Sequence, residues 1–61
     1  HMRQFTTRDV STGEVSREDK GLSLQSVNGI TDWTEFEFDT IANLDVGQHM
    51  TVSGIQVERT A

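Results

Sequence analysis

Five glycines divide this chain into short segments, and no proline interrupts any of them. They stand at positions 13, 21, 29, 47 and 54, so that the first three are eight residues apart. Turn residues at this spacing are typical of short strands joined by tight turns. A length of 61 residues excludes the large parallel-sheet enzyme architectures, which need far more sequence.

The N-terminal third is predicted to hold a hairpin. Residues 3–10 and 14–18 are rich in Thr, Ser and Val, which favour strands over helix. Gly13, in the loop between them, can adopt the positive φ angle that a tight turn requires. Leu22 and Leu24 alternate with polar residues, which predicts a half-buried strand over 22–27.

The remaining segments are also predicted to be mainly strands. Asn28-Gly29 is a strong two-residue hairpin signal and leads into 30–39, which is rich in strand formers. Residues 40–46 could form one helical turn, since Ile41 and Leu44 are three residues apart and would share one face of a helix. The last strands are expected at 48–53 and 55–59, with a bulge or tight bend at Gly54.

These segments predict an all-β fold of five or six short strands with one optional helical turn near 40–46. It would be a small antiparallel sheet or an SH3-like or OB-like barrel. Residues 1–2 are interpreted as a tag remnant and start Met, and residues 3–61 as a single small β domain.

A domain of this size has little apolar material with which to build a core. Such a chain buries only about 60% of its surface, so self-association or docking on a partner is expected. The predicted core side chains are Phe5, Val10, Val15, Leu22, Leu24, Val27, Ile30, Trp33, Phe36, Phe38, Ile41, Leu44, Val46, Met50, Val52, Ile55 and Val57.

Charge is distributed very unevenly along the chain. Ten acidic residues outnumber five basic ones, for a net charge of −5. No Lys or Arg occurs between Gly21 and Glu58, whereas the acids concentrate there. The candidate partner-binding residues all come from this stretch, and they are Asp32, Trp33, Glu35, Glu37, Asp39 and Asp45.

If 33–39 is a strand, its alternation buries Phe36 and Phe38 and lines the other face with Glu35, Glu37 and Asp39. Carboxylates on one strand face lie roughly 6.7 Å apart, close to the phosphate spacing of a nucleic-acid strand. The face is an ordinary solvated surface, a surface that imitates nucleic acid and docks on a basic protein, or a divalent-cation site without calcium-loop spacing. Trp33 is either part of the core, fully or partly buried, or an anchor at that surface.

Several chemistries are not expected. The chain has no Cys, no Gly-rich phosphate loop and no calcium-binding loop. His49 has Ser53 four residues away, but the sequence indicates no third member of a catalytic triad. We therefore expect no enzymatic activity, no cofactor and no metal. The lack of Cys favours a reducing compartment such as the cytoplasm, and no apolar run suggests a membrane span.

The expected function is thus that of a non-enzymatic acidic domain acting by protein–protein interaction. A phage- or plasmid-type accessory or inhibitor protein that covers a basic, nucleic-acid-binding partner is one example. The first alternative is a structural subunit that assembles with copies of itself into a ring or virion-type component. The second, weaker alternative is an OB-like or SH3-like module that binds nucleic acid directly, with a small basic patch from Arg3, Arg8 and Arg17.

Overall fold

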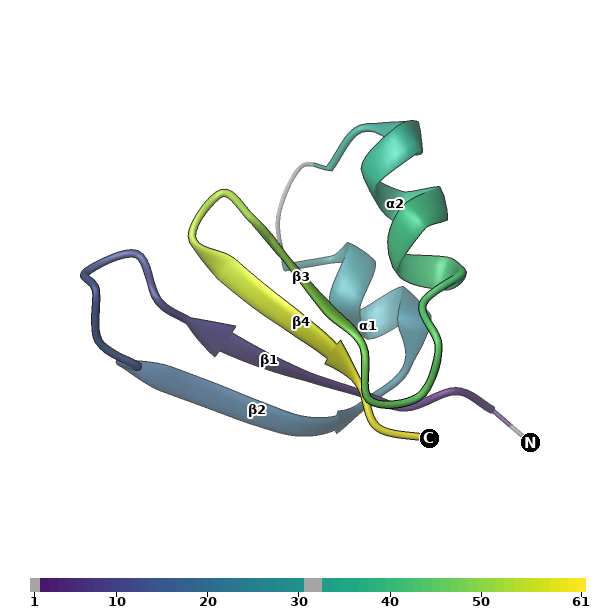
Figure 1. Cartoon of the computed structure of the whole chain (residues 1–61), viewed down its shortest axis with the longest axis horizontal. Coiled ribbons are helices and arrows are strands. Elements are labelled where there is room, and N and C mark those ends of the chain that lie inside the picture. Colours follow the sequence, from purple (N-terminus) through teal and green to yellow (C-terminus); the bar gives the residue numbers. More distant parts are fainter. Residues whose placement is uncertain (1, 31–32) are drawn as a thin grey trace.

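The computed structural model describes residues 2–30 and 33–61, which form a four-stranded antiparallel sheet and two short helices (Figure 1). The spatial order of the strands is β2-β1-β4-β3. A small β-rich fold is therefore confirmed, whereas the barrel and the count of five or six strands are wrong for the described residues. In chain order the elements are β1 (Phe5–Asp9), β2 (Arg17–Leu22), α1 (Leu24–Asn28), α2 (Glu35–Ala42), β3 (His49–Val52) and β4 (Ile55–Arg59).

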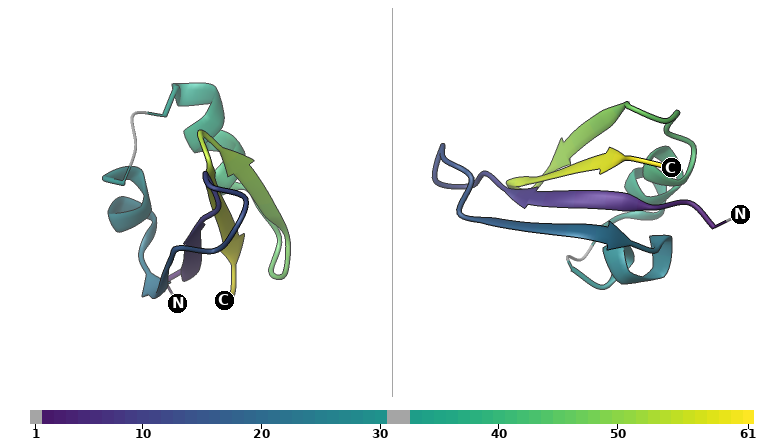
Figure 2. Two further views of the ribbon diagram at one scale, coloured as in Figure 1. Left: turned by 90° about the vertical axis from the view of Figure 1, so that its left-hand side faces the viewer. Right: turned by 90° about the horizontal axis from the view of Figure 1, so that it is seen from below.

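Both helices cover the same face of the sheet, which we call the inner face (Figure 2). Helix α1 contacts β1, and α2 contacts β3. The fully buried core takes one side chain from each of four elements: Phe5, Val27, Ile41 and Val57. This cluster therefore joins both helices to the two central strands. Neither described helix has the length and apolar character needed to span a bilayer.

The predicted N-terminal hairpin is confirmed, but its loop is longer than expected. β1 pairs with β2 from Phe5↔Leu22 to Asp9↔Arg17, and residues 10–16 connect them. The pairing shifts register between Phe5 and Thr7, where two β2 residues oppose one of β1. Gly21 lies in this bulge with a φ angle of 68°, a conformation that glycine adopts without strain.

The predicted C-terminal strands are confirmed as the β3–β4 hairpin. Val52 pairs with Ile55 across a two-residue turn in which Ser53 and Gly54 have φ angles of 52° and 77°. Both angles are positive, as in a type I′ turn, whose twist matches that of the strands. A Cβ atom on Gly54 would lie 2.8 Å from the Cβ of Ser11, so the turn also packs closely on the 10–16 loop.

The strand predicted over 22–27 is wrong, because most of that segment is α1. Ser23 caps this helix, its hydroxyl accepting a hydrogen bond from the backbone N–H of Ser26 at 3.2 Å. The predicted Asn28-Gly29 hairpin is also wrong. Gly29 has a φ angle of −81° and caps the C-terminus of α1, so its freedom to adopt positive φ is not used.

The strand predicted over 30–39 is wrong as well, since its second half belongs to α2. Thr34 and Glu37 form a capping box: the Thr34 hydroxyl accepts from the Glu37 N–H, and the Glu37 carboxylate accepts from the Thr34 N–H. This reciprocal pair satisfies two backbone donors that a helix start leaves free. Local capping thus outweighs the strand propensity and the alternating pattern of the segment.

The other end of α2 is stabilised from the sheet. The helix ends at Ala42, so the helical turn expected at 40–46 is confirmed only for its first three residues. The Arg3 guanidinium donates to the carbonyl of Ala42, and Arg59 Nη1 donates to the carbonyl of Leu44 at 2.8 Å. The charge of Arg3 therefore meets the negative end of the helix dipole, and Arg59 holds the chain just beyond it.

Four of the predicted core side chains lie at the surface instead. Phe36 is 79% exposed, Val46 60%, Val15 56% and Ile30 42%. Three of them occupy connecting segments, where no element covers them. Phe36 is different, because it lies on a helix and faces away from the core.

Candidate functional site

The acidic stretch singled out by the sequence does not form one continuous face. Trp33 is half-buried and packs against the core cluster just before α2. Its indole Nε1 is buried and has no hydrogen-bond partner among the described residues. Asp32 lies outside the described residues. Trp33 is therefore positioned by the core, with the partial burial that one of the two alternatives predicted.

The predicted row of three carboxylates on a strand face is wrong, because these residues lie on a helix. Glu37 is half-buried and its Oε1 accepts from the Thr34 N–H at 2.8 Å, so it serves the capping box. Glu35 and Asp39 are exposed and one helical turn apart. The helix therefore separates a structural carboxylate from two that are free to meet a partner.

The sequence analysis placed Phe36 in the core, whereas it dominates the outward side of α2. Residues three, four and seven positions further along share this side of the helix. The name α2 surface is used below for Glu35, Phe36, Asp39, Thr40 and Asn43. The signal that would have revealed it is the capping-box pattern from Thr34 to Glu37, which predicts a helix start and changes the periodicity from two to 3.6.

Two side chains of the α2 surface are fixed to the helix backbone. The Thr40 hydroxyl donates to the carbonyl of Phe36 at 2.8 Å, and the Asn43 amide donates to the carbonyl of Asp39 at 2.8 Å. These bonds hold the polar neighbours of Phe36 in place. The aromatic ring and the two carboxylates are the groups left to contact another molecule.

Shallow depressions flank α2 on both sides. One of about 370 Å³ lies toward α1 and is lined by Asn28, Trp33, Thr34, Glu35, Phe38 and Asp39. The other, of about 400 Å³, lies toward the start of β3 and is lined by Phe36, Asp39, Thr40, Asn43, Leu44 and Gln48. Asp39 borders both, so its carboxylate is central to this part of the molecule.

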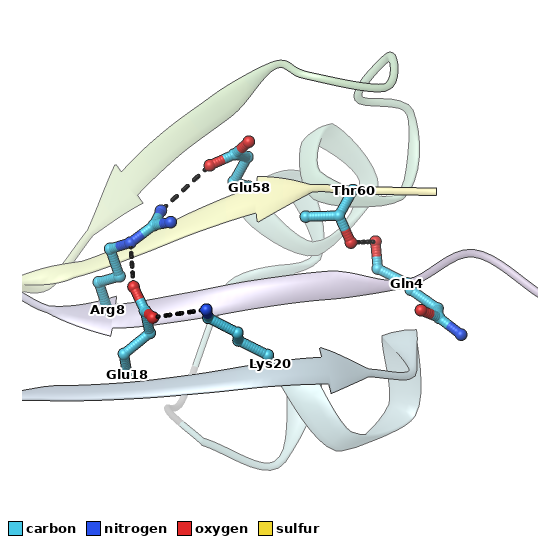
Figure 3. Close-up of polar contacts among 6 residues, drawn as sticks. All are labelled: Gln4, Arg8, Glu18, Lys20, Glu58 and Thr60. Atoms are coloured by element: carbon cyan, nitrogen blue, oxygen red, sulfur yellow. Dashed lines mark hydrogen bonds and ion pairs between the residues drawn. The ribbon is translucent and has the colours of Figure 1, made fainter.

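Charged side chains on the outer face of the sheet neutralise one another (Figure 3). Arg8 Nε lies 2.5 Å from Glu18 Oε2, and Arg8 Nη1 lies 3.1 Å from Glu58 Oε1. Lys20 Nζ lies 3.5 Å from the other oxygen of Glu18. These four residues link β2, β1 and β4 and present no net charge.

The geometry of this network shifts the pKa values of its members. The hydrogen bond from Arg8 lowers the pKa of Glu18, and hydrogen bonds to Glu58 and Glu18 raise the pKa of Arg8. Both ions are thus stabilised in their charged forms. The arginine patch expected from Arg3, Arg8 and Arg17 does not form, because the three residues bond to separate partners.

A third depression, of about 400 Å³, lies on the inner face and is lined by Thr7, Asp9, Arg17, Asp19, Ile30 and Ile55. Its charges are compensated internally. Arg17 Nε lies 3.0 Å from Asp19 Oδ2. The hydroxyl and N–H of Ser11 donate to Asp9 Oδ1, which lowers the pKa of that carboxyl. This groove therefore offers few free polar groups.

The last two polar candidates lie near the start of β3. Asp45 is exposed, and its N–H donates to the side chain of Gln48 at 3.0 Å in the turn before the strand. His49 is exposed at the beginning of β3, in register with Glu58. Over residues 2–30 and 33–61, no three His, Cys, Asp or Glu side chains gather in a way that would hold a metal ion.

Comparisons of the chain with models of protein families, with curated proteins and with solved structures found no match. The functional argument therefore depends on the geometry of the α2 surface.

Proposed function

We propose that this domain is non-enzymatic and acts by protein–protein interaction, with the α2 surface docking on a basic partner. One observation carries the proposal: Phe36 is 79% exposed on a helix whose neighbouring outward residues are carboxylates. Aromatic side chains in the middle of an interface supply a large share of binding energy, particularly inside a polar rim. Phe36 supplies such an anchor, and Glu35 and Asp39 supply part of the rim.

Charge defines the class of partner. Glu35 and Asp39 have no ion-pair partner among the described residues, and no Lys or Arg occurs in the segment between Gly21 and Glu58. A surface of one sign attracts Lys and Arg of a partner, speeds association and repels acidic surfaces. A nucleic-acid-binding protein carries such a basic surface, so an accessory or inhibitor role toward one follows from the same charge.

A self-assembling subunit is the second candidate, and the sheet supports it. The sheet is open, so that β2 and β3 are both edge strands. Edge strands have unpaired backbone groups that can pair with another copy. Sedimentation velocity over a concentration series tests this candidate: a monomer at high micromolar concentration would contradict it. Direct nucleic-acid binding is less favoured, because Arg8 and Lys20 are already paired with carboxylates.

The protein-binding proposal is tested by selecting a random dodecapeptide phage library on the immobilised chain. Selected peptides should be rich in Lys and Arg. Their binding should fall about tenfold or more in F36A and in D39K, since one variant removes the anchor and the other reverses a rim charge. E14K makes the same charge change in the exposed 10–16 loop and serves as the matched control.

Binding should also weaken with added salt, because the charges involved are solvent-exposed. Two results would contradict the proposal. One is a selection that shows no basic enrichment. The other is an equal loss of binding in D39K and E14K, which would mean that only the net charge of the chain matters.

A further inference from the structure

The outer edge of β3 has backbone groups that point away from the sheet. In an antiparallel pair, successive residues alternate between facing the neighbouring strand and facing away from it. Val52 pairs with Ile55 at the two-residue turn, and the Arg59 N–H donates to the Gln48 carbonyl at 3.0 Å at the other end of the pair. Met50 and Val52 therefore bond to β4, and the backbone groups of His49 and Thr51 face outward.

The two edges of the sheet are protected to different degrees. Natural edge strands are commonly blocked by a Lys, a Pro or a bulge. The β2 edge has two of these features, namely Lys20 and the bulge at Gly21. β3 has the sequence His-Met-Thr-Val in unbroken register with β4, and it has none of them. Only the β3 edge is thus suited to accept another strand.

The α2 surface and the β3 edge are neighbours. Helix α2 lies over the β3 side of the sheet, and the two contact each other. The depression of about 400 Å³ joins them, since its lining runs from Phe36 and Asp39 to Gln48, the residue that precedes β3. A strand added at this edge would therefore lie beside that depression, with alternate side chains on the α2 side of the sheet.

We propose that β3 accepts an extended, Lys- or Arg-containing segment of the partner as a fifth strand. This inference rests on the proposed function and specifies how the partner binds. Main-chain bonds to His49 and Thr51 supply affinity, as in other strand-addition complexes. Basic side chains on the α2 side of the added strand meet Asp39 and Asp45, and an apolar residue on the same side contacts Phe36.

A second copy of this chain fits the same edge less well. Pairing of β3 with its own copy would bring two α2 surfaces together, each with carboxylates and without a base. Like charges across an interface oppose association. All five Lys and Arg residues are engaged in hydrogen bonds or ion pairs elsewhere in the described structure. The charge balance therefore favours a basic segment from another protein.

The test compares T51P with T51V. Proline at this position removes the outward N–H, leaves the bonds of Met50 and Val52 to β4 in place, and is tolerated on an edge strand. The probe is a peptide from the library selection above, used in free form and also with N-methyl groups on alternate residues. We expect T51P and the methylated peptide to bind at least tenfold more weakly, and T51V to bind normally. Backbone NMR shifts on binding should centre on residues 48–52.

The other outcomes distinguish strand addition by a basic segment from binding by the α2 surface alone and from pairing with a second copy. If D39K weakens binding but T51P and the methylated peptide do not, the α2 surface binds its partner without strand addition and the inference is wrong. If T51P weakens binding and D39K does not, the occupant is not chosen by its charge, which also overturns the inference. If the chain is a dimer that T51P converts to a monomer, a second copy occupies the edge. The methylated peptide keeps the test valid if T51P fails to fold.

Discussion

The sheet and helix α2 differ in whether their carboxylates are paired with basic residues. On the outer face of the sheet, Arg8 is held between Glu18 and Glu58, so its charges compensate one another. On α2, Glu35 and Asp39 form no ion pair with another described residue. Paired ions stabilise a fold or specify its register, whereas unpaired ions on an exposed helix are available to a partner. The contrast locates the candidate interface more precisely than net charge does.

The largest effect is expected at the core that joins the two regions. Ile41 of α2 is fully buried against Phe5 and Val57, so I41A should lower the free energy of unfolding by about 3 kcal/mol. A domain of this length has a total stability of roughly 3–9 kcal/mol, so at the low end of that range about half of the variant molecules would be unfolded. Urea unfolding followed by circular dichroism measures the change.

F36A is the matched control on the same helix. Its side chain is 79% exposed, so the free energy of unfolding should change by less than about 0.5 kcal/mol. A large loss of stability in F36A would mean that Phe36 packs in the fold, and the argument for a free anchor would fail.

The second effect concerns the start of α2. T34A removes the hydroxyl that accepts from the Glu37 N–H and should cost about 1 kcal/mol. T34S keeps the hydroxyl and E37Q keeps an acceptor for the Thr34 N–H, so both should stay within a few tenths of a kcal/mol of the parent. Urea midpoints of the three variants decide the matter. Equal stability of T34A and T34S would contradict the assigned role of the capping box.

The same capping box explains how far the sequence could predict the structure. The two hairpins were predictable because their turns depend on local residues, such as Gly13 and Ser53-Gly54. The helical segment was not, because Glu-Phe-Glu-Phe fits a strand by its alternation and a helix by its cap. Whether Phe36 is exposed depends on whether this segment is a helix or a strand, so its exposure could not be predicted before that was known. The acidity of this region was predictable, since it depends on composition alone.

The third effect is a pH dependence that arises in the sheet. The pKa of Glu18 is lowered from its ordinary value of 4.5 by Arg8, and that of Asp9 from 3.8 by Ser11. The folded state therefore binds fewer protons than the unfolded state in this range, and stability is lost as the pH falls below about 4.5. Arg8, whose pKa is raised, stays charged throughout.

E18Q should flatten this dependence, since it removes one of the two carboxyls that have a lowered pKa among the described residues. E14Q changes an exposed loop residue without an ion pair in the described structure and should leave the pH profile unchanged. Thermal unfolding between pH 3 and pH 7 gives the comparison. Parallel profiles for E18Q and the parent would show that the Arg8 network does not contribute to stability in solution.

The smallest effect on stability is expected for D39K, which should change stability and binding in opposite directions. Glu35 and Asp39 are like charges one turn apart on α2, an arrangement that weakens a helix slightly. D39K converts it into a favourable pair with Glu35 and places a cation nearer the C-terminus of the helix, which should raise the free energy of unfolding by about 0.5 kcal/mol. The same change should weaken binding of basic peptides about tenfold or more. A carboxylate that lowers stability where a lysine would raise it is consistent with a role in binding. If D39K is less stable than the parent, or binds basic peptides as well as E14K does, Asp39 is not a binding residue of this surface.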